Sequence, residues 1–144
     1  LFRITLGYPE REAERRLLAR GGTGSSTALA GIRPLASARL VVQLQAIARA
    51  VHLSDTLIAY VQELLAFSRN SGQFAVGLSP RAGLALLAAA QAWALMASRD
   101  FVLPEDVQAV LPAVVGHRLR SADTLVGPGP EALQQAFAGV HVPA

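Results

Sequence analysis

The residues with the clearest chemical potential are Ser79, Pro80 and Arg81, which open a long helix predicted from Pro80 to Ala97. Serine is a favoured N-cap, and proline is favoured at the first helical position because its missing N–H would be unpaired there. Arg81 therefore lies in the first turn, where the positive end of the helix dipole disfavours a cation. The same place suits an arginine that meets an anion such as a phosphate. The three residues alone leave open a phosphate-binding arginine and an ordinary solvated one.

Other site chemistries find little support in the sequence. The three histidines, His52, His117 and His141, lack metal-ligand spacing, and there is no cysteine, so no metal site is predicted. Most of the acids have helix-terminal explanations, and Asp100 is expected to tether the turn after Arg99. No serine lies in a G-x-S-x-G motif. The chain has no lysine and therefore no P-loop.

Composition limits the function classes further. The chain has 144 residues, of which 52% are hydrophobic and 16% charged, which is typical of one folded domain. The net charge of +3 comes from scattered arginines, whereas a nucleic-acid surface normally shows a basic stripe. We expect no membrane span, no signal peptide and no disulfide, which is compatible with a cytoplasmic location.

The hydrophobic pattern predicts a mainly α fold, a bundle of about five to six helices with a short amino-terminal strand. Phe2, Ile4 and Leu6 alternate with polar residues as in a strand, and a short helix follows Pro9. Ser37 and Ser54 are predicted to cap two helices, the first with an apolar stripe from Leu40 to Val51 and the second with one from Leu57 to Leu65.

The second half of the chain is expected to form the centre of the bundle. The helix from Pro80 is apolar on every face, which predicts complete burial, with Leu84, Leu87, Trp93 and Leu95 in the core. Tyr60 is expected to join the core as well. Another helix begins at Pro104 and should kink or split at Pro112. A last short helix is predicted around Glu131–Phe137.

Several short motifs occur in the order found in the C-terminal lid of MoxR-type AAA+ ATPases, which the chain resembles over almost its whole length. They are Gly7-Tyr8-Pro9, Val51–Asp55, Ser68-Arg69, Ser79–Ala82, Ala90–Ala94, Arg99–Val102, Pro104–Val107 and His117–Leu119. The sequence departs from the family at Ser98, where glycine is usual, and at Leu103, where a capping threonine is usual. The stretch Gly21–Gly31 is a further departure, since it does not resemble the family.

This resemblance implies a domain division and a role for Arg81. Residues 1–20 would be a remnant of the AAA+ core, residues 21–33 a flexible linker and residues 34–144 the helical lid. In such proteins an arginine at this position, called sensor 2, reaches the γ-phosphate of ATP. Arg81 would be the catalytic residue, and Arg81, Pro80 and Ser79 the cofactor-binding residues. His117-Arg118, at a helix C-terminus, is interpreted as structural.

The resemblance also implies a wider context. The parent protein would use ATP with magnesium, although this chain alone should bind no cofactor and be inactive. Its partners would be the AAA+ core of the same protein and neighbouring subunits of a ring, such as a hexamer. Proteins with von Willebrand factor A domains are further partners of the family, and its activity is chaperone-like remodelling or maturation of client proteins. The alternative is a helical nucleic-acid-binding or protein-interaction module unrelated to ATPases.

Overall fold

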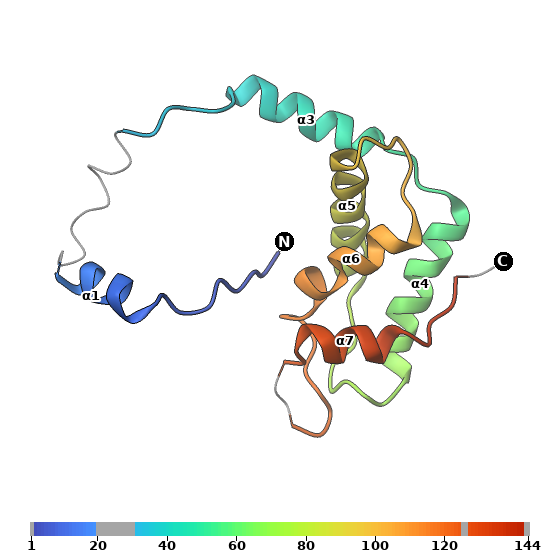
Figure 1. Ribbon diagram of the computed structural model, residues 1–144. Helices are drawn as coiled ribbons and strands as arrows, with labels where there is room; N and C mark the ends of the chain where they lie inside the picture. The colour runs from blue at the N-terminus through green and yellow to red at the C-terminus, as the bar shows by residue number, and fades with distance from the viewer. Residues whose placement is uncertain (1, 20–30, 125–126, 143–144) are drawn as a thin grey trace. The chain divides into compact units, whose positions relative to one another are not determined.

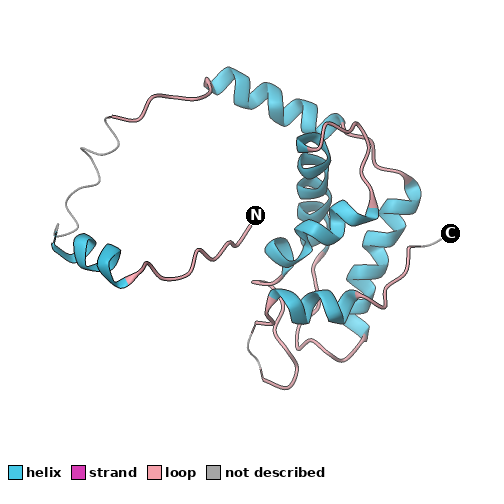
Figure 2. Cartoon of the chain, in the orientation of Figure 1, coloured by secondary structure: helices cyan, strands magenta, loops and turns pink. Residues whose placement is uncertain are grey.

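The computed structural model describes residues 2–19, 31–124 and 127–142, and these contain six α-helices joined by loops (Figures 1 and 2). The only strand-like pairings in these ranges are two isolated bridges, His52 with Phe101 and Phe74 with Ser121. The helices are α1 Arg11–Ala19, α3 Ala38–Ala50, α4 Asp55–Asn70, α5 Pro80–Met96, α6 Pro104–Val115 and α7 Pro130–Phe137. The mainly α fold predicted from the sequence is confirmed, and no described helix is long and apolar enough to cross a membrane.

The chain divides into two compact units, each of which is described by itself. The smaller unit is Ile4–Val42, and its helix α1 has no buried residue. The predicted strand at Phe2–Leu6 is wrong, because these residues form no strand and a strand requires a neighbour. Residues 20–30, which include most of the predicted linker, lie outside the described residues.

The larger unit, Leu1–Arg3 with Gln43–Ala144, contains a single hydrophobic core. Helix α5 packs against α6 and α4, and α7 packs against α6. The predicted inward face of α4 is confirmed, with Leu57, Tyr60, Val61 and Leu64 all buried. At one end of this core Phe137 contacts two other rings, with centroid distances of 5.3 Å to Phe67 and 5.6 Å to Phe74.

Helix α5 buries its small residues and exposes several of its large ones. The predicted complete burial of this helix is wrong, since Leu84, Trp93 and Met96 are 69%, 46% and 79% exposed. The buried side chains are Ala82, Ala85, Leu86, Ala89, Ala90, Gln91 and Ala94. Helices approach closely where the contact residues are alanine, so the alanines set a short distance to the neighbours. An all-apolar pattern cannot show which face the neighbours cover.

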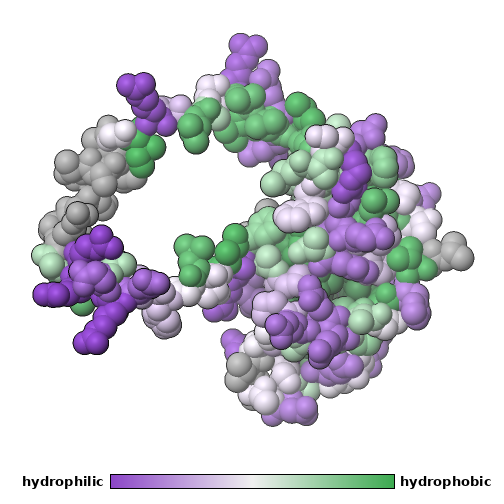
Figure 3. Space-filling view, in the orientation of Figure 1, coloured by the Kyte–Doolittle hydropathy of each residue, from purple (hydrophilic) through white to green (hydrophobic). Residues whose placement is uncertain are grey.

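Helix α3 also exposes its apolar stripe. The sequence predicted an inward face from Leu40 to Val51, but no residue of α3 is buried, and only Val51, just beyond its end, joins the core. Figure 3 shows apolar side chains at the surface along α3. The end of this helix is nevertheless held, because the buried Gln91 of α5 donates to the carbonyls of Arg49 (3.2 Å) and Val51 (2.8 Å).

Helix ends follow their sequence signals closely. The hydroxyls of Ser37 and Ser54 accept N–H bonds from Leu40 and Leu57, so both predicted caps are confirmed. Prolines start α5, α6 and α7. Helix α6 continues through Pro112 to Val115, so the expectation that it might split there is wrong.

The position where the family usually has glycine lies at the end of α5. Ser98 has a φ of +57°, in the left-handed region that glycine adopts most readily. The N–H of Ser98 bonds to the carbonyl of Leu95, and that of Arg99 to the carbonyl of Ala94. This pair of bonds is a Schellman motif, so the backbone keeps the family's turn although the side chain differs.

Candidate functional site

Arg81 lies in the first turn of α5 with its side chain exposed, as the sequence predicted. Within the described residues it makes no hydrogen bond or ion pair, so its guanidinium is available to a ligand from outside this unit. The residues that follow it, Ala82 and Gly83, are both buried. The site is therefore an exposed cation on a backbone that is packed into the core.

Ser79 and Pro80 occupy the positions predicted for them, with one correction. Ser79 is the N-cap residue, at φ −77° and ψ 161°, but its side chain accepts no capping hydrogen bond. Its carbonyl instead accepts the N–H groups of Ala82 (2.9 Å) and Gly83 (3.4 Å). The Ser79 hydroxyl thus remains free of partners in the part of the chain that the structure describes.

The segment before α5 is fixed by the end of α4, which sequence reasoning missed. Ser68 is 1% exposed, and its hydroxyl accepts the N–H of Leu78 at 2.9 Å. The Nε of Arg69 donates to the carbonyl of the same Leu78, also at 2.9 Å. Ser68-Arg69 was noticed only as a family motif, because a separation of ten residues gives no local signal of contact.

A second feature that the sequence did not indicate is the pairing of Arg99 with Asp106. Both amino groups of the Arg99 guanidinium bond to the Asp106 carboxylate, with Nη1 to Oδ2 at 2.7 Å. Asp106 also accepts the N–H of Leu103 at 2.8 Å. Leu103, the N-cap residue of α6, has no side-chain acceptor. The Asp106 carboxylate therefore makes the side-chain capping bond at the start of this helix.

The environment of Asp106 favours its charged form. Hydrogen bonding from Arg99, assisted by the N–H of Leu103 and the guanidinium charge, lowers the pKa of the Asp106 carboxyl below its usual value, although burial opposes this. The expectation that the Asp100 side chain tethers the turn after Arg99 is wrong. Asp100 contributes its backbone carbonyl instead, which accepts the N–H of His52 at 2.8 Å.

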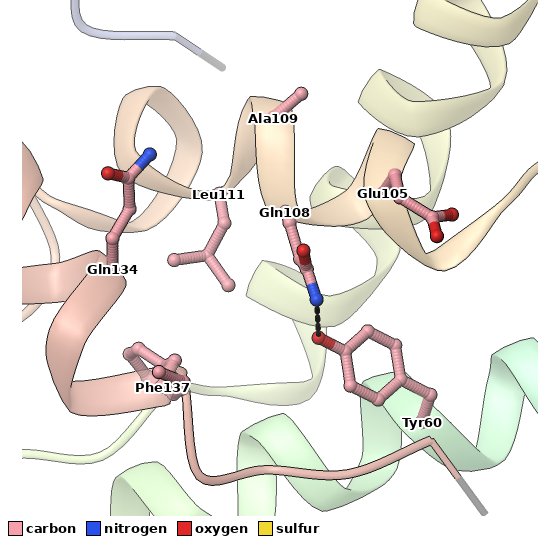
Figure 4. A pocket seen from close by; sticks show the side chains of 8 residues that line it. Tyr60, Glu105, Gln108, Ala109, Leu111, Gln134 and Phe137 are labelled. Carbon is pink, nitrogen blue, oxygen red and sulfur yellow. Dashed lines mark hydrogen bonds between the residues drawn. The ribbon is translucent and has the colours of Figure 1, made fainter.

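The remaining polar residues do not assemble a reaction centre. In the described ranges no three histidine, aspartate or glutamate side chains gather as metal ligands would. Arg118 Nε donates to the neighbouring His117 Nε2 at 3.3 Å, which fits the structural interpretation of this pair. A cavity of about 480 Å³ between α4, α6 and α7 contains Tyr60, whose hydroxyl accepts a bond of 3.2 Å from Gln108 (Figure 4). Its lining offers one charged group, Glu105.

Comparisons with known proteins agree with this fold. Residues 66–136 match the family model described as the AAA lid domain. A crystal structure from Cytophaga hutchinsonii, named a "putative ATPase", superposes with a TM-score of 0.75 at 23% identity, covering 99% of this chain and 46% of that one. At this identity the likeness supports the fold alone. The family match thus identifies residues 66–136 as an AAA lid domain.

Relatives in sequence narrow the class further. Chaperone MoxR1 of Mycobacterium tuberculosis is 36% identical over 128 residues, 83% of this chain and 33% of the relative. Protein MoxR of Paracoccus denitrificans is 34% identical over 113 residues, which cover 65% of this chain and 32% of the relative. YeaC of Bacillus subtilis is 31% identical over 119 residues, which cover 83% of this chain and 37% of the relative. The chain therefore belongs to the lid domains of MoxR-type AAA+ proteins. It spans about a third of the length of these relatives.

Proposed function

We propose that this chain serves as the lid of an ATP-hydrolysing AAA+ protein and that Arg81 acts there as its sensor 2 residue. The observation that carries the proposal is an exposed, unpaired arginine in the first turn of α5, in a chain that matches the AAA lid family. Arginine suits the task because its planar fork stays charged and can bond two phosphate oxygens. Arg81 would contact the γ-phosphate, with Ser79 and Pro80 beside it.

The nucleotide itself would be held largely by other parts of the longer protein. This chain has no lysine, so the P-loop would come from an AAA+ core, and the core would supply the magnesium ligands as well. What the chain offers is one phosphate contact, the free Arg81 guanidinium. ATP that bridges core and lid would favour a closed arrangement of the two, and hydrolysis would release it.

The same proposal covers the assembly and its work. A relative named as a chaperone supports a chaperone-like action on client proteins. The protein would act as a cytoplasmic ring, such as a hexamer, in which the lid contacts a neighbouring subunit. Partners with von Willebrand factor A domains belong to this proposal as well.

The test is Arg81→Ala in the full-length protein that contains this chain, with ATP turnover and thermal unfolding measured together. Losing a charge-assisted contact at the reacting phosphate should cost on the order of 2–4 kcal/mol, or about 10²-fold or more in kcat. Arg81→Lys should recover part of the rate, since it restores charge without the bidentate fork. The melting temperature should stay near that of the unmodified protein.

Arg49→Ala is the matched control, because it removes another exposed arginine from the same unit. Turnover of this variant should be close to normal. Normal turnover in Arg81→Ala would reject the sensor role, and a large fall in its melting temperature would show that Arg81 is structural instead.

A further inference from the structure

The last turn of α4 holds one residue, Leu78, by both of its backbone polar groups. The N–H of Leu78 donates to the Ser68 hydroxyl, and its carbonyl accepts from Arg69 Nε. The Ser68 hydroxyl is itself oriented, because it donates to the carbonyl of Leu65 at 2.7 Å. The Leu78 side chain is buried as well. Two neighbouring residues of α4 therefore fix the chain three residues before Arg81.

Close packing supports this hold on both sides of Arg81. A Cβ added to Gly77 would lie 2.8 Å from the Arg69 Cα, so this glycine lets the two backbones touch. A Cβ on Gly83 would lie 2.9 Å from a methyl carbon of Leu65, so α5 also approaches α4 closely just after Arg81. The segment can shift away from α4 only by losing these contacts.

Little freedom remains between Leu78 and Arg81. Ser79 has the extended conformation of an N-cap, and the ring of Pro80 fixes its φ. The direction in which Arg81 leaves the helix therefore depends on where Leu78 is held. A bidentate contact with a phosphate is sensitive to such direction, and a misplacement of about 1 Å can cost ~10²-fold in rate.

We infer that Ser68 and Arg69 are positioning residues that aim Arg81 at the phosphate. This inference rests on the proposed role of Arg81. It assigns Arg69 a role through its Nε–H donor rather than through its charge. An arginine that contacted nucleotide directly would depend on its charge, and one that merely held α4 to the segment 77–78 would affect stability without acting through Arg81.

Two substitutions in the full-length protein separate donor from charge. The amide nitrogen of Arg69→Gln takes the place of Nε and keeps a donor without the charge, whereas Arg69→Lys keeps the charge and has a methylene there. We expect kcat to fall on the order of tenfold in Arg69→Ala and Arg69→Lys, with recovery in Arg69→Gln. Ser68→Ala should behave like Arg69→Ala. Asn70→Ala, an exposed neighbour on α4, is the control and should keep normal turnover.

A double-mutant cycle then shows whether Arg69 acts through Arg81. In an Arg81→Ala background, Arg69→Ala should lower kcat no further, because there is no longer an arginine to aim. Three outcomes would overturn the positioning role while Arg81→Ala stays slow. They are additive losses of kcat in the double variant, equal rates for Arg69→Gln and Arg69→Ala, and normal turnover in Arg69→Ala. Normal turnover in Arg81→Ala would instead reject the proposed function, and the inference with it. Melting temperatures identify any variant that fails to fold. If Arg69→Ala is such a variant, the turnover of Arg69→Gln compared with that of Arg69→Lys decides whether the Nε–H donor or the charge matters.

Discussion

Asp106 joins the end of α5 to the start of α6 through its carboxylate. It accepts two hydrogen bonds from Arg99 and one from the N–H of Leu103, and its side chain is only 5% exposed. An acid near a helix N-terminus is favoured by the dipole, and here it also replaces the missing side-chain cap at Leu103. One residue thus satisfies a helix end and neutralises a neighbouring cation.

We predict that Asp106 makes the stability of this chain depend on pH in the acid range. Because the folded state lowers its pKa, the stabilisation is fully present above the unfolded value of about 4 and is lost as pH falls through the folded value. Asp106→Asn should lower the free energy of unfolding near neutral pH by about 1–3 kcal/mol, since it leaves partly buried donors poorly paired. Denaturant unfolding between pH 2 and 7 would measure both effects.

Glu105→Gln is the control for this experiment, because Glu105 is an exposed acid one residue earlier in the same turn. It should change the free energy of unfolding much less and leave the acid-range slope in place. An equal loss from both substitutions would mean that charge near the helix end, rather than the pairing with Arg99, is responsible.

Among the elements, α5 has an unusual distribution of side-chain size. Its contact face is made mostly of alanines, and Leu84, Trp93 and Met96 face away from the core. Substitutions should therefore have effects opposite to those expected from side-chain size alone. Small residues on the contact face control the helix spacing, whereas large ones outside it contribute little to the stability of this unit.

We predict that Ala90→Leu lowers the free energy of unfolding of this chain by about 1–3 kcal/mol, because Ala90 is fully buried and added atoms would overpack the core. Leu84→Ala, on the exposed side of the same helix, should change it by no more than about 0.5 kcal/mol. Chemical denaturation of the two variants gives the comparison. A larger loss from Leu84→Ala would show that its side chain belongs to the core.

The elements that the sequence predicted correctly are those with local signals. Ser37 and Ser54 mark the starts of α3 and α4, and each hydroxyl caps the N–H of the residue three positions later. Prolines mark the starts of α5, α6 and α7. Burial of α5 was mispredicted because an all-apolar pattern has no preferred face. The Phe2–Leu6 strand was mispredicted because alternation alone cannot supply a partner strand.

The site was predictable only in part for a similar reason. The position of Arg81 in the first turn was predicted because proline and serine define that turn locally, whereas its proposed role came from the family resemblance. The hold of Ser68 and Arg69 on Leu78, and the pairing of Arg99 with Asp106, depend on where the chain turns between the partners. Each contact crosses a turn between two helices, and periodicity analysis applies only within one element, so it predicts neither.

For the molecule as a whole, the features relevant to nucleotide are sparse. The chain has no P-loop lysine, and Arg81 is its only proposed phosphate contact. One charge-assisted contact supports weak binding at most, because association also costs translational and rotational freedom.

We therefore predict that this chain by itself neither hydrolyses ATP nor binds it with micromolar affinity, with or without magnesium. Isothermal titration with ATP should show no saturable binding, and Arg81→Ala should leave the titration unchanged. A dissociation constant in the micromolar range, abolished by Arg81→Ala, would mean that the lid carries a nucleotide site of its own.

The exposed apolar side chains of α3 and α5 also affect the temperature dependence of stability. Side chains that meet water in the folded state add little newly hydrated surface on unfolding, and the hydration of apolar surface gives unfolding its large positive heat-capacity change. The heat-capacity change of this chain should therefore fall below the ~12–15 cal/mol/K per residue of ordinary globular domains. Its stability curve should be correspondingly flat, with cold denaturation shifted to lower temperature.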